Sequence, residues 1–215
     1  MTNLETILKD LEEHYGGYHT NVPRNVVSDL LPPDIKLNPS GMTGGDRMTA
    51  HKYAKNYSLF LSKFIKDRSK SYVIVECGIL KGTGLAIWST LFPNAQIIGL
   101  DIDLSHTKNN LDFLKSQGAF ENNNLELYEF DQFADNASSI TKILKNRKID
   151  IAIDDGFHSD TTILNTYRDL SPHLNKKFCY FIEDNKTVHN IIKDQIDNCN
   201  IHYHKQLTII TDKDA

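Results

Sequence analysis

The chain has 215 residues, of which 40% are hydrophobic and 24% are charged, as is typical of one globular domain. This balance excludes a disordered tail, a collagen-like repeat and a coiled coil. The 24 basic and 28 acidic side chains give a formal net charge of −4, and the basic residues are scattered along the chain. Because binding to a phosphate backbone needs a concentrated cationic surface, we expect no nucleic-acid partner.

The sequence carries no signal for a membrane or for export. No apolar stretch approaches the roughly 18 residues that span a bilayer, so we expect no membrane association. The segment MTNLETILKDLEEH has acidic residues where a secretory signal has a basic region and an apolar core. We therefore expect a soluble, cytoplasmic protein. Whether it forms a homo-oligomer stays open.

The three cysteines are Cys77, Cys179 and Cys199. Their number is odd, and no C-x-x-C spacing occurs among them. This arrangement favours buried thiols over a disulfide or a zinc site.

Residues 1–66 are predicted to form a helical arm and lid, and residues 67–215 a compact core. Apolar residues recur on one face of residues 3–14, which predicts a short amphipathic helix. Residues 16–46 are rich in Gly, Pro, Asn and Ser, and their four prolines exclude a long helix or a central strand. Aromatic and leucine side chains then recur at helical spacing and predict a second helix over about residues 48–66.

After residue 71, short β-rich runs alternate with helix-length segments such as 83–91 and 161–170. The runs expected as parallel strands are 72–76, 96–101, 125–130, 149–153 and 178–182. Runs such as VIV and FCYFI are apolar on both faces, as strands covered by helices on both sides are. The pattern predicts an α/β fold with a doubly wound, mostly parallel sheet.

The end of the chain departs from this alternation. A helix-like segment, 188–196, is followed by two closely spaced strand candidates, 201–204 and 207–211. No crossover helix fits between these two strands, so they must pair antiparallel if they pair at all. The predicted sheet therefore has seven strands and a C-terminal hairpin.

Ligands of open α/β sheets bind outside the carboxyl ends of the strands. The first strand ends in a glycine-rich turn that contains Glu76, Gly78 and Gly82. The second strand ends at Asp101, where a carboxylate typically accepts hydrogen bonds from the two ribose hydroxyls of a nucleoside. Both nicotinamide dinucleotides and S-adenosylmethionine carry this ribose.

The spacing of the glycine loop favours S-adenosylmethionine. A dinucleotide fingerprint reads G-x-G-x-x-G and seats a pyrophosphate, whereas this loop reads E-x-G-x-x-x-G. The carboxylate of Glu76 suits an ammonium group and opposes a pyrophosphate. A tight turn that binds nothing is the alternative for this loop. Asp131 and Gln132 follow the third strand and either hold an adenine edge or form a simple turn.

The fourth and fifth strands end in IDDGFH and IEDN. Neighbouring strands lie about 4.8 Å apart, so Asp155, Glu183 and Asp184 converge if these strands are adjacent. Their mutual repulsion would raise their pKa values, and a divalent cation, Mg²⁺ or else Mn²⁺ or Ca²⁺, would relieve it. Solvated acids that cap the following helices are the alternative. His158, beside this cluster, suits a general base.

The motifs VECGILKGTG, GLDID, IDDGFH and FIEDN occur in this order. They resemble the class I S-adenosylmethionine-dependent methyltransferases, and within them the metal-dependent macrolide and sugar O-methyltransferases of the mycinamicin type, whose relatives include proteins labelled cephalosporin hydroxylase. The resemblance covers about residues 46–184 and includes an element D-R-x-x-x-H-x-Y-x-x-x-Y that begins at Asp46. It implies a Rossmann-like methyltransferase fold with S-adenosylmethionine and Mg²⁺, or Mn²⁺, as cofactors.

The resemblance also implies roles for individual residues. The cofactor contacts would be Glu76, Gly78, Gly82, Asp101, Asp131, Gln132 and Tyr57. The metal ligands would be Asp155, Glu183 and Asp184, with His158 as the catalytic base. The implied reaction is methyl transfer to an oxygen of a small molecule: a sugar, a related natural-product or surface-glycan precursor, or a phosphate derivative. A nucleotide-dependent oxidoreductase or hydroxylase and a catalytically silent binding subunit are the alternatives.

Overall fold

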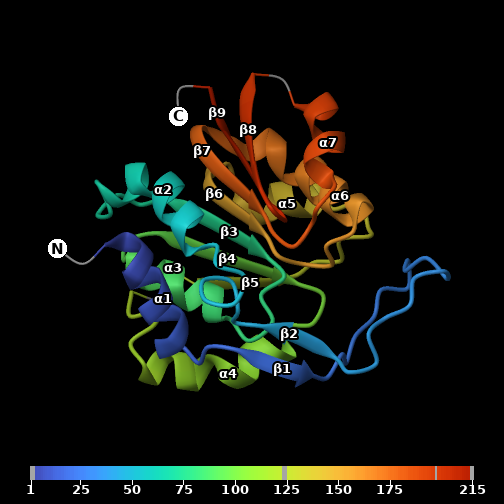
Figure 1. The fold of residues 1–215 in the computed structure, drawn as a ribbon, viewed down its shortest axis with the longest axis horizontal. Helices are drawn as coiled ribbons and strands as arrows, with labels where there is room; N and C mark the ends of the chain where they lie inside the picture. The colour runs from blue at the N-terminus through green and yellow to red at the C-terminus, as the bar shows by residue number, and fades with distance from the viewer. Residues whose placement is uncertain (1–2, 123–124, 197, 214–215) are drawn as a thin grey trace.

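The computed structural model describes residues 3–122, 125–196 and 198–213. Its centre is a seven-stranded sheet with the order β5-β4-β3-β6-β7-β9-β8 (Figure 1). The strands are β3 (Val73–Cys77), β4 (Gln96–Asp101), β5 (Leu125–Glu129), β6 (Ile149–Asp154), β7 (Leu174–Ile182), β8 (Cys199–His204) and β9 (Leu207–Asp212). This arrangement confirms the predicted α/β sheet.

Strand pairing brings the predicted site to one edge of the sheet. Strand β3 pairs in parallel with both β4 and β6, and β6 pairs in parallel with β7. The predicted antiparallel hairpin of β8 and β9 is confirmed, and β9 lies between β7 and β8. Because the strand order reverses at β3, the crevice outside β3 and β6 is the expected ligand site.

Helices cover both faces of the sheet (Figure 1). The helices are α1 (Leu4–His14), α2 (Ala54–Ile65), α3 (Thr83–Leu91), α4 (Ser105–Ser116), α5 (Ala137–Leu144), α6 (Asp160–Leu170) and α7 (Val188–Ile192), with 3-10 turns Ser171–His173 and Lys193–Gln195. Helices α1 to α4 contribute to one hydrophobic cluster and α5 to α7 to the other. The N-terminal helices therefore share their core with the sheet.

Two predicted helices are shorter than expected. The second helix begins at Ala54, because residues 46–53 form turns in which the N–H of His51 bonds the Asp46 carbonyl and that of Tyr53 bonds the Arg47 carbonyl. Lys52 adopts a left-handed φ of 63°, which interrupts helical geometry. The helix predicted over 188–196 ends at Ile192 and tightens into a 3-10 turn.

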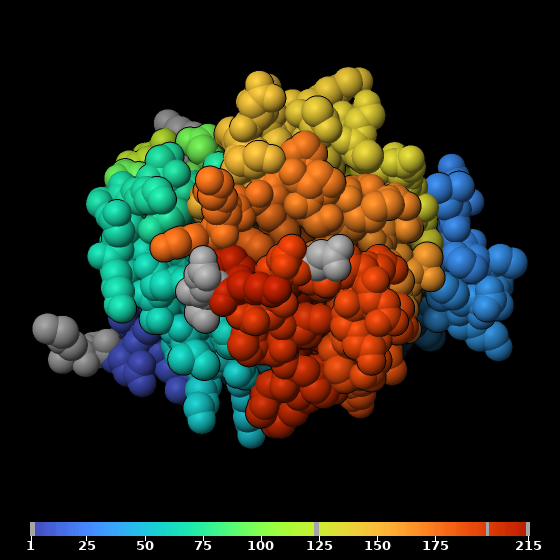
Figure 2. Space-filling view, turned by 90° about the horizontal axis from the view of Figure 1, so that it is seen from above, coloured from blue at the N-terminus to red at the C-terminus, as the bar shows by residue number. Residues whose placement is uncertain are grey.

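The Gly- and Pro-rich N-terminal segment contains a small antiparallel sheet of β1 (His19–Val22) and β2 (Met42–Gly44). Residues 23–41 connect these strands, and we call them the arm. The arm projects at one side of the molecule, in blue in Figure 2. Ser28 donates to Asp131 at 2.5 Å, and Asn25 donates to Asp103 at 3.1 Å. The arm therefore crosses the carboxyl ends of β4 and β5.

The cysteines lie in the strands. Cys77 and Cys179 are buried free thiols, as predicted, in β3 and β7. Cys199 is less buried than expected, because it begins the edge strand β8. Over residues 3–122, 125–196 and 198–213, no helix has both the length and the apolar character needed to cross a membrane.

Candidate functional site

A cavity of about 640 Å³ opens at the carboxyl edge of the sheet, beneath the arm. This volume lies within the range of roughly 300–1,000 Å³ that small-molecule sites show. Most of the predicted site residues line it: Glu76, Gly78, Asp101, Asp131, Gln132, Asp155, His158 and Asp184. Three further residues that were predicted to bind cofactor or metal lie outside its lining: Gly82, Tyr57 and Glu183.

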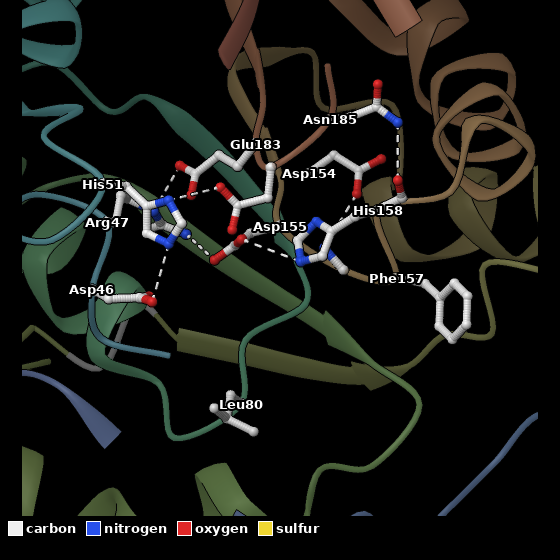
Figure 3. A network of polar contacts seen from close by, with 12 residues as sticks. Asp46, Arg47, His51, Leu80, Asp154, Asp155, Phe157, His158, Glu183 and Asn185 are labelled. Carbon is white, nitrogen blue, oxygen red and sulfur yellow. Dashed lines mark hydrogen bonds and ion pairs between the residues drawn. The ribbon is translucent and has the colours of Figure 1, made fainter. Parts of the chain in front are cut away.

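The guanidinium of Arg47 forms the centre of the site (Figure 3). Its Nη2 donates to Glu76 at 2.7 Å and to Asp155 at 2.9 Å, and its Nε lies 2.7 Å from Glu183. The arginine is 6% exposed. One buried cation therefore joins the ends of β3, β6 and β7.

The pKa values follow from this burial. Burial by itself would lower the pKa of Arg47, but Glu183 and Glu76 raise it well above its usual value. Burial raises the pKa of Glu183 well above the ordinary range, and Arg47 offsets only part of that increase. Burial raises the pKa of Asp155 to about 8, again against the opposing effect of Arg47. Burial therefore dominates the pKa values of both acids, and Arg47 offsets only part of its effect.

Glu183 and Tyr57 face the protein interior. Glu183 is 2% exposed and accepts a hydrogen bond from the Tyr57 hydroxyl in addition to its ion pair with Arg47. The Tyr57 ring stacks against Phe181 and Trp88. Both side chains therefore stabilise the wall behind the cavity.

Asp184 points toward the cavity instead. Its Oδ1 accepts hydrogen bonds from Tyr53 at 2.6 Å and Gln206 at 3.0 Å, and lies 3.2 Å from Nδ1 of His51. All three contacts fall on one oxygen, so Oδ2 has no partner among the described residues. A left-handed φ of 55° at Asp184 turns it away from the direction of Glu183.

His158 lies beside Asp155, with 4.0 Å between Nε2 and Oδ1 (Figure 3). Its backbone has a left-handed φ of 62°, and its carbonyl accepts a hydrogen bond from Asn185 at 2.9 Å. The next residue, Ser159, caps helix α6. The backbone of His158 is therefore held in place, while the buried Nδ1 of its imidazole has no hydrogen-bond partner among the described residues.

One group of side chains in the described ranges has the geometry of a metal site. Ligand atoms of Asp155, His158 and Asp184 all lie within 4.8 Å of one another. The group shares Asp155 and Asp184 with the predicted ligand set, but it contains His158 where the prediction has Glu183. The difference arises because Arg47 and Tyr57 already engage Glu183.

The loop after β3 is held by Asp101. Its Oδ2 accepts the N–H groups of Ile79 at 2.8 Å and Leu80 at 3.1 Å. Gly78 has a φ of 81°, and a Cβ there would lie 2.1 Å from the carbonyl oxygen of Asp155, so the approach of the two loops requires glycine. Gly82 faces α4, where a Cβ would lie 3.0 Å from the Thr107 side chain.

The two polar residues after β5, Asp131 and Gln132, differ in their hydrogen-bond partners. Gln132 is 8% exposed; its amide donates to Asp154 and Thr166, both at 2.8 Å, and accepts the N–H of Phe157 at 2.7 Å. Asp131 binds Ser28 of the arm and the N–H of Phe133. Gln132 therefore joins the β5 and β6 loops, and Asp131 fastens the arm.

Several site residues were not singled out by the sequence analysis. Arg47 appeared only within a motif, and Glu12, Tyr53 and Gln206 were not assigned a role at the site. Buried Glu12 accepts the N–H groups of Met48 at 2.7 Å and Thr49 at 2.9 Å, which fixes the turn that carries Arg47. The sequence did contain an indication of Arg47. Several carboxylates at neighbouring strand ends require a counter-ion, which the chain itself can supply.

We expect Arg47→Met to lower the free energy of unfolding by about 3–5 kcal/mol, because it leaves buried carboxylates without their counter-ion. Arg47→Lys should destabilise less, since it keeps the charge but loses the planar fork. Urea denaturation in the presence of a chelator measures both. The control is Lys9→Met: Lys9 pairs with Glu5 at 2.7 Å, the two side chains are 42% and 31% exposed, and a loss below about 1 kcal/mol is expected. Wild-type stability of Arg47→Met would contradict the central role of this ion-pair cluster.

Comparisons with known proteins support the fold. No protein-family model and no curated protein matches the sequence. Among solved structures, the methyltransferase MycE of the mycinamycin pathway, in complex with Mg and SAH, is 20% identical with a TM-score of 0.59. The match covers 76% of this chain and 50% of that one, so this chain spans about half the length of MycE.

Two further structures agree with this assignment. The complex of MycE with Mg, SAH and mycinamycin VI is 21% identical, with a TM-score of 0.58, over 76% of this chain and 50% of that one. A fibrillarin/Nop5p complex gives 14% identity and a TM-score of 0.50 over 71% of this chain and 79% of that one. The protein thus has the fold of the class I S-adenosylmethionine-dependent methyltransferases.

Proposed function

We propose that this protein is an S-adenosylmethionine-dependent methyltransferase that uses a divalent cation, Mg²⁺ or Mn²⁺, to methylate an oxygen of a small molecule. The observation that carries the proposal is the placement of two carboxylates, Asp155 and Asp184 as metal ligands, within 4.8 Å of His158 as base, beside a cavity that also contains Asp101. The methyltransferase fold and the Mg and SAH named for MycE support it. A sugar or another hydroxyl-bearing precursor of a natural product or surface glycan fits this chemistry.

The cofactor half of the cavity is the edge formed by β3, β4 and β5. Asp101 is half-exposed and keeps lone pairs beyond those used by the N–H groups of Ile79, Leu80 and Asp103. These lone pairs suit ribose hydroxyls. Asp131, beyond β5, lines the same half and suits the adenine end of the cofactor.

The residues near β6 and β7 fit a hard divalent cation. Asp155 and Asp184 each have one carboxylate oxygen without a hydrogen bond from the described residues. Burial, together with the charges of Asp184 and Glu76, raises the pKa of Asp155. Two carboxylates leave positions for water and acceptor, as Mg²⁺ requires. Glu183, predicted as a third ligand, could bind a cation only after its ion pair with Arg47 is broken.

When bound, S-adenosylmethionine supplies the methyl group and the cation lowers the pKa of the acceptor hydroxyl. His158 accepts the proton of that hydroxyl as general base, a role typically worth about 10²- to 10⁴-fold in rate. Tyr53, His51 and Gln206 hold Asp184 in place. The arm excludes water from the cofactor edge and so shields the methyl transfer from solvent.

Asp101→Ala should weaken SAH binding by about 1.5–3 kcal/mol, the usual contribution of hydrogen bonds to a charged group. Isothermal titration calorimetry measures the affinity. The matched control is Asp112→Ala on the exposed surface of α4, which should bind SAH like the wild type. An unchanged affinity in Asp101→Ala would remove this residue from the cofactor site, and binding of NAD(H) in place of SAH would favour an oxidoreductase.

Asp155→Asn and Asp184→Asn should each weaken Mn²⁺ binding at least tenfold, because each removes a charged oxygen ligand. Glu183→Gln should stay within about threefold of wild type, because Glu183 faces Arg47 and Tyr57. Electron paramagnetic resonance of free Mn²⁺ gives the affinities. A loss in Glu183→Gln equal to that in Asp155→Asn would restore Glu183 to the ligand set.

His158→Ala should keep the SAH and Mn²⁺ affinities of the wild type but lose about two to four decades of kcat. Turnover is followed as SAH release with acceptors drawn from a panel of sugars and small phosphorylated compounds. Phe157→Ala, whose ring points away from the acidic cluster in Figure 3, is the neighbouring control. If His158→Ala retains turnover within a few-fold of wild type, His158 is not the base.

A further inference from the structure

The side of the cavity formed by the arm and the loop after β3 carries positive charge. His19, Arg24, Lys36 and Lys81 all line the cavity from this side. Elsewhere in the described chain, the half-buried cations Lys63 and Arg147 have carboxylate partners at 3.0 Å and 2.5 Å, as Arg47 does. Arg24, Lys36 and Lys81 make no ion pair with any described residue.

Two polar atoms of this group are buried without a partner. Nε2 of His19 and Nε of Arg24 are inaccessible to solvent and make no hydrogen bond within the described chain. A buried donor without a partner costs free energy, so its position is explained when a ligand supplies the acceptor. Burial and the charge of nearby Lys81 both lower the pKa of His19, which indicates that His19 and Lys81 lie close together.

Acids that line the same cavity accept hydrogen bonds from groups of the protein. Asp101 binds the N–H groups of the loop after β3, and Asp131 binds Ser28 and the N–H of Phe133. Asp155 and Asp184 lie near Arg47 and Tyr53. The cavity is therefore polarised, with a carboxylate and imidazole side and a cationic side.

We propose that Arg24 and Lys81, with Lys36 at the rim and His19 beside them, bind a phosphoryl group of the methyl acceptor. Three formal cations suit a doubly charged tetrahedral anion better than a single carboxylate, and the planar Arg24 fork matches phosphate oxygens. This inference rests on the proposed function and assigns its acceptor to the phosphorylated compounds. The acceptor thus spans the cavity, with its anion against the arm and its reacting hydroxyl near His158.

The test uses inorganic phosphate as the probe. Metal-free protein saturated with SAH is titrated with phosphate by calorimetry at constant ionic strength, so that binding through a cation at Asp155 and Asp184 does not contribute. We expect the wild type to bind phosphate more tightly than acetate. Arg24→Gln and Lys81→Gln should each weaken phosphate binding by about five- to thirtyfold, and Arg24→Gln should leave SAH affinity unchanged.

Lys108→Gln and Lys142→Gln are the matched controls, because both lysines are exposed on helices outside the cavity lining. Equal phosphate affinities in all four variants, or no phosphate binding to the SAH complex, would overturn the proposal. Competition between phosphate and SAH, with SAH affinity lost in Arg24→Gln, would assign these cations to the carboxylate of the cofactor instead. Failure of wild type to bind SAH would count against the methyltransferase function, and phosphate titration of the cofactor-free protein would still test the subsite.

Discussion

The buried guanidinium of Arg47 is the constraint on which the site depends. Glu76, Asp155 and Glu183 come from three different strands and converge because parallel strands end at the same edge. Without a cation, such a cluster would carry a prohibitive desolvation cost. The guanidinium serves all three because its nitrogens are fixed in one plane. Glu12, which also lines the cavity, holds the turn that presents Arg47, so helix α1 contributes to the site at the edge of the sheet.

Arg47 also divides the acids by function. Glu76, which also accepts a hydrogen bond from Trp88 at 2.6 Å, and Glu183 are fully engaged and form the rigid back of the site. Asp155 keeps one oxygen free of Arg47, and Asp184 lies beyond its reach. The remaining negative charge is thus concentrated next to His158, where a divalent cation and an acceptor hydroxyl are needed. In the proposed site, Arg47 neutralises the buried acids, and the divalent cation binds Asp155 and Asp184.

The N-terminal 66 residues complete the cavity from the other direction. Helices α1 and α2 pack into the same hydrophobic cluster as the sheet, which anchors the arm at its base. Ser28 and Asn25 then fasten it over the ends of β4 and β5. Because the arm also brings Arg24 and Lys36 to the cavity, it both shields the cofactor edge and sets the charge of the acceptor side.

The sequence by itself determined the strand-and-helix alternation, the antiparallel C-terminal hairpin and the edge at which the acids gather, because these follow from local periodicity and parallel topology. The tertiary structure decided which acids are buried in ion pairs and which face the cavity. Glu183 and Asp184 are adjacent in sequence, yet their partners Tyr57 and Tyr53 lie 126 and 131 residues away, and a left-handed turn at Asp184 separates their directions. Local pattern carries no information about such distant contacts. Arg47 could be recognised as the common counter-ion only once the folded chain had brought it to three strand ends.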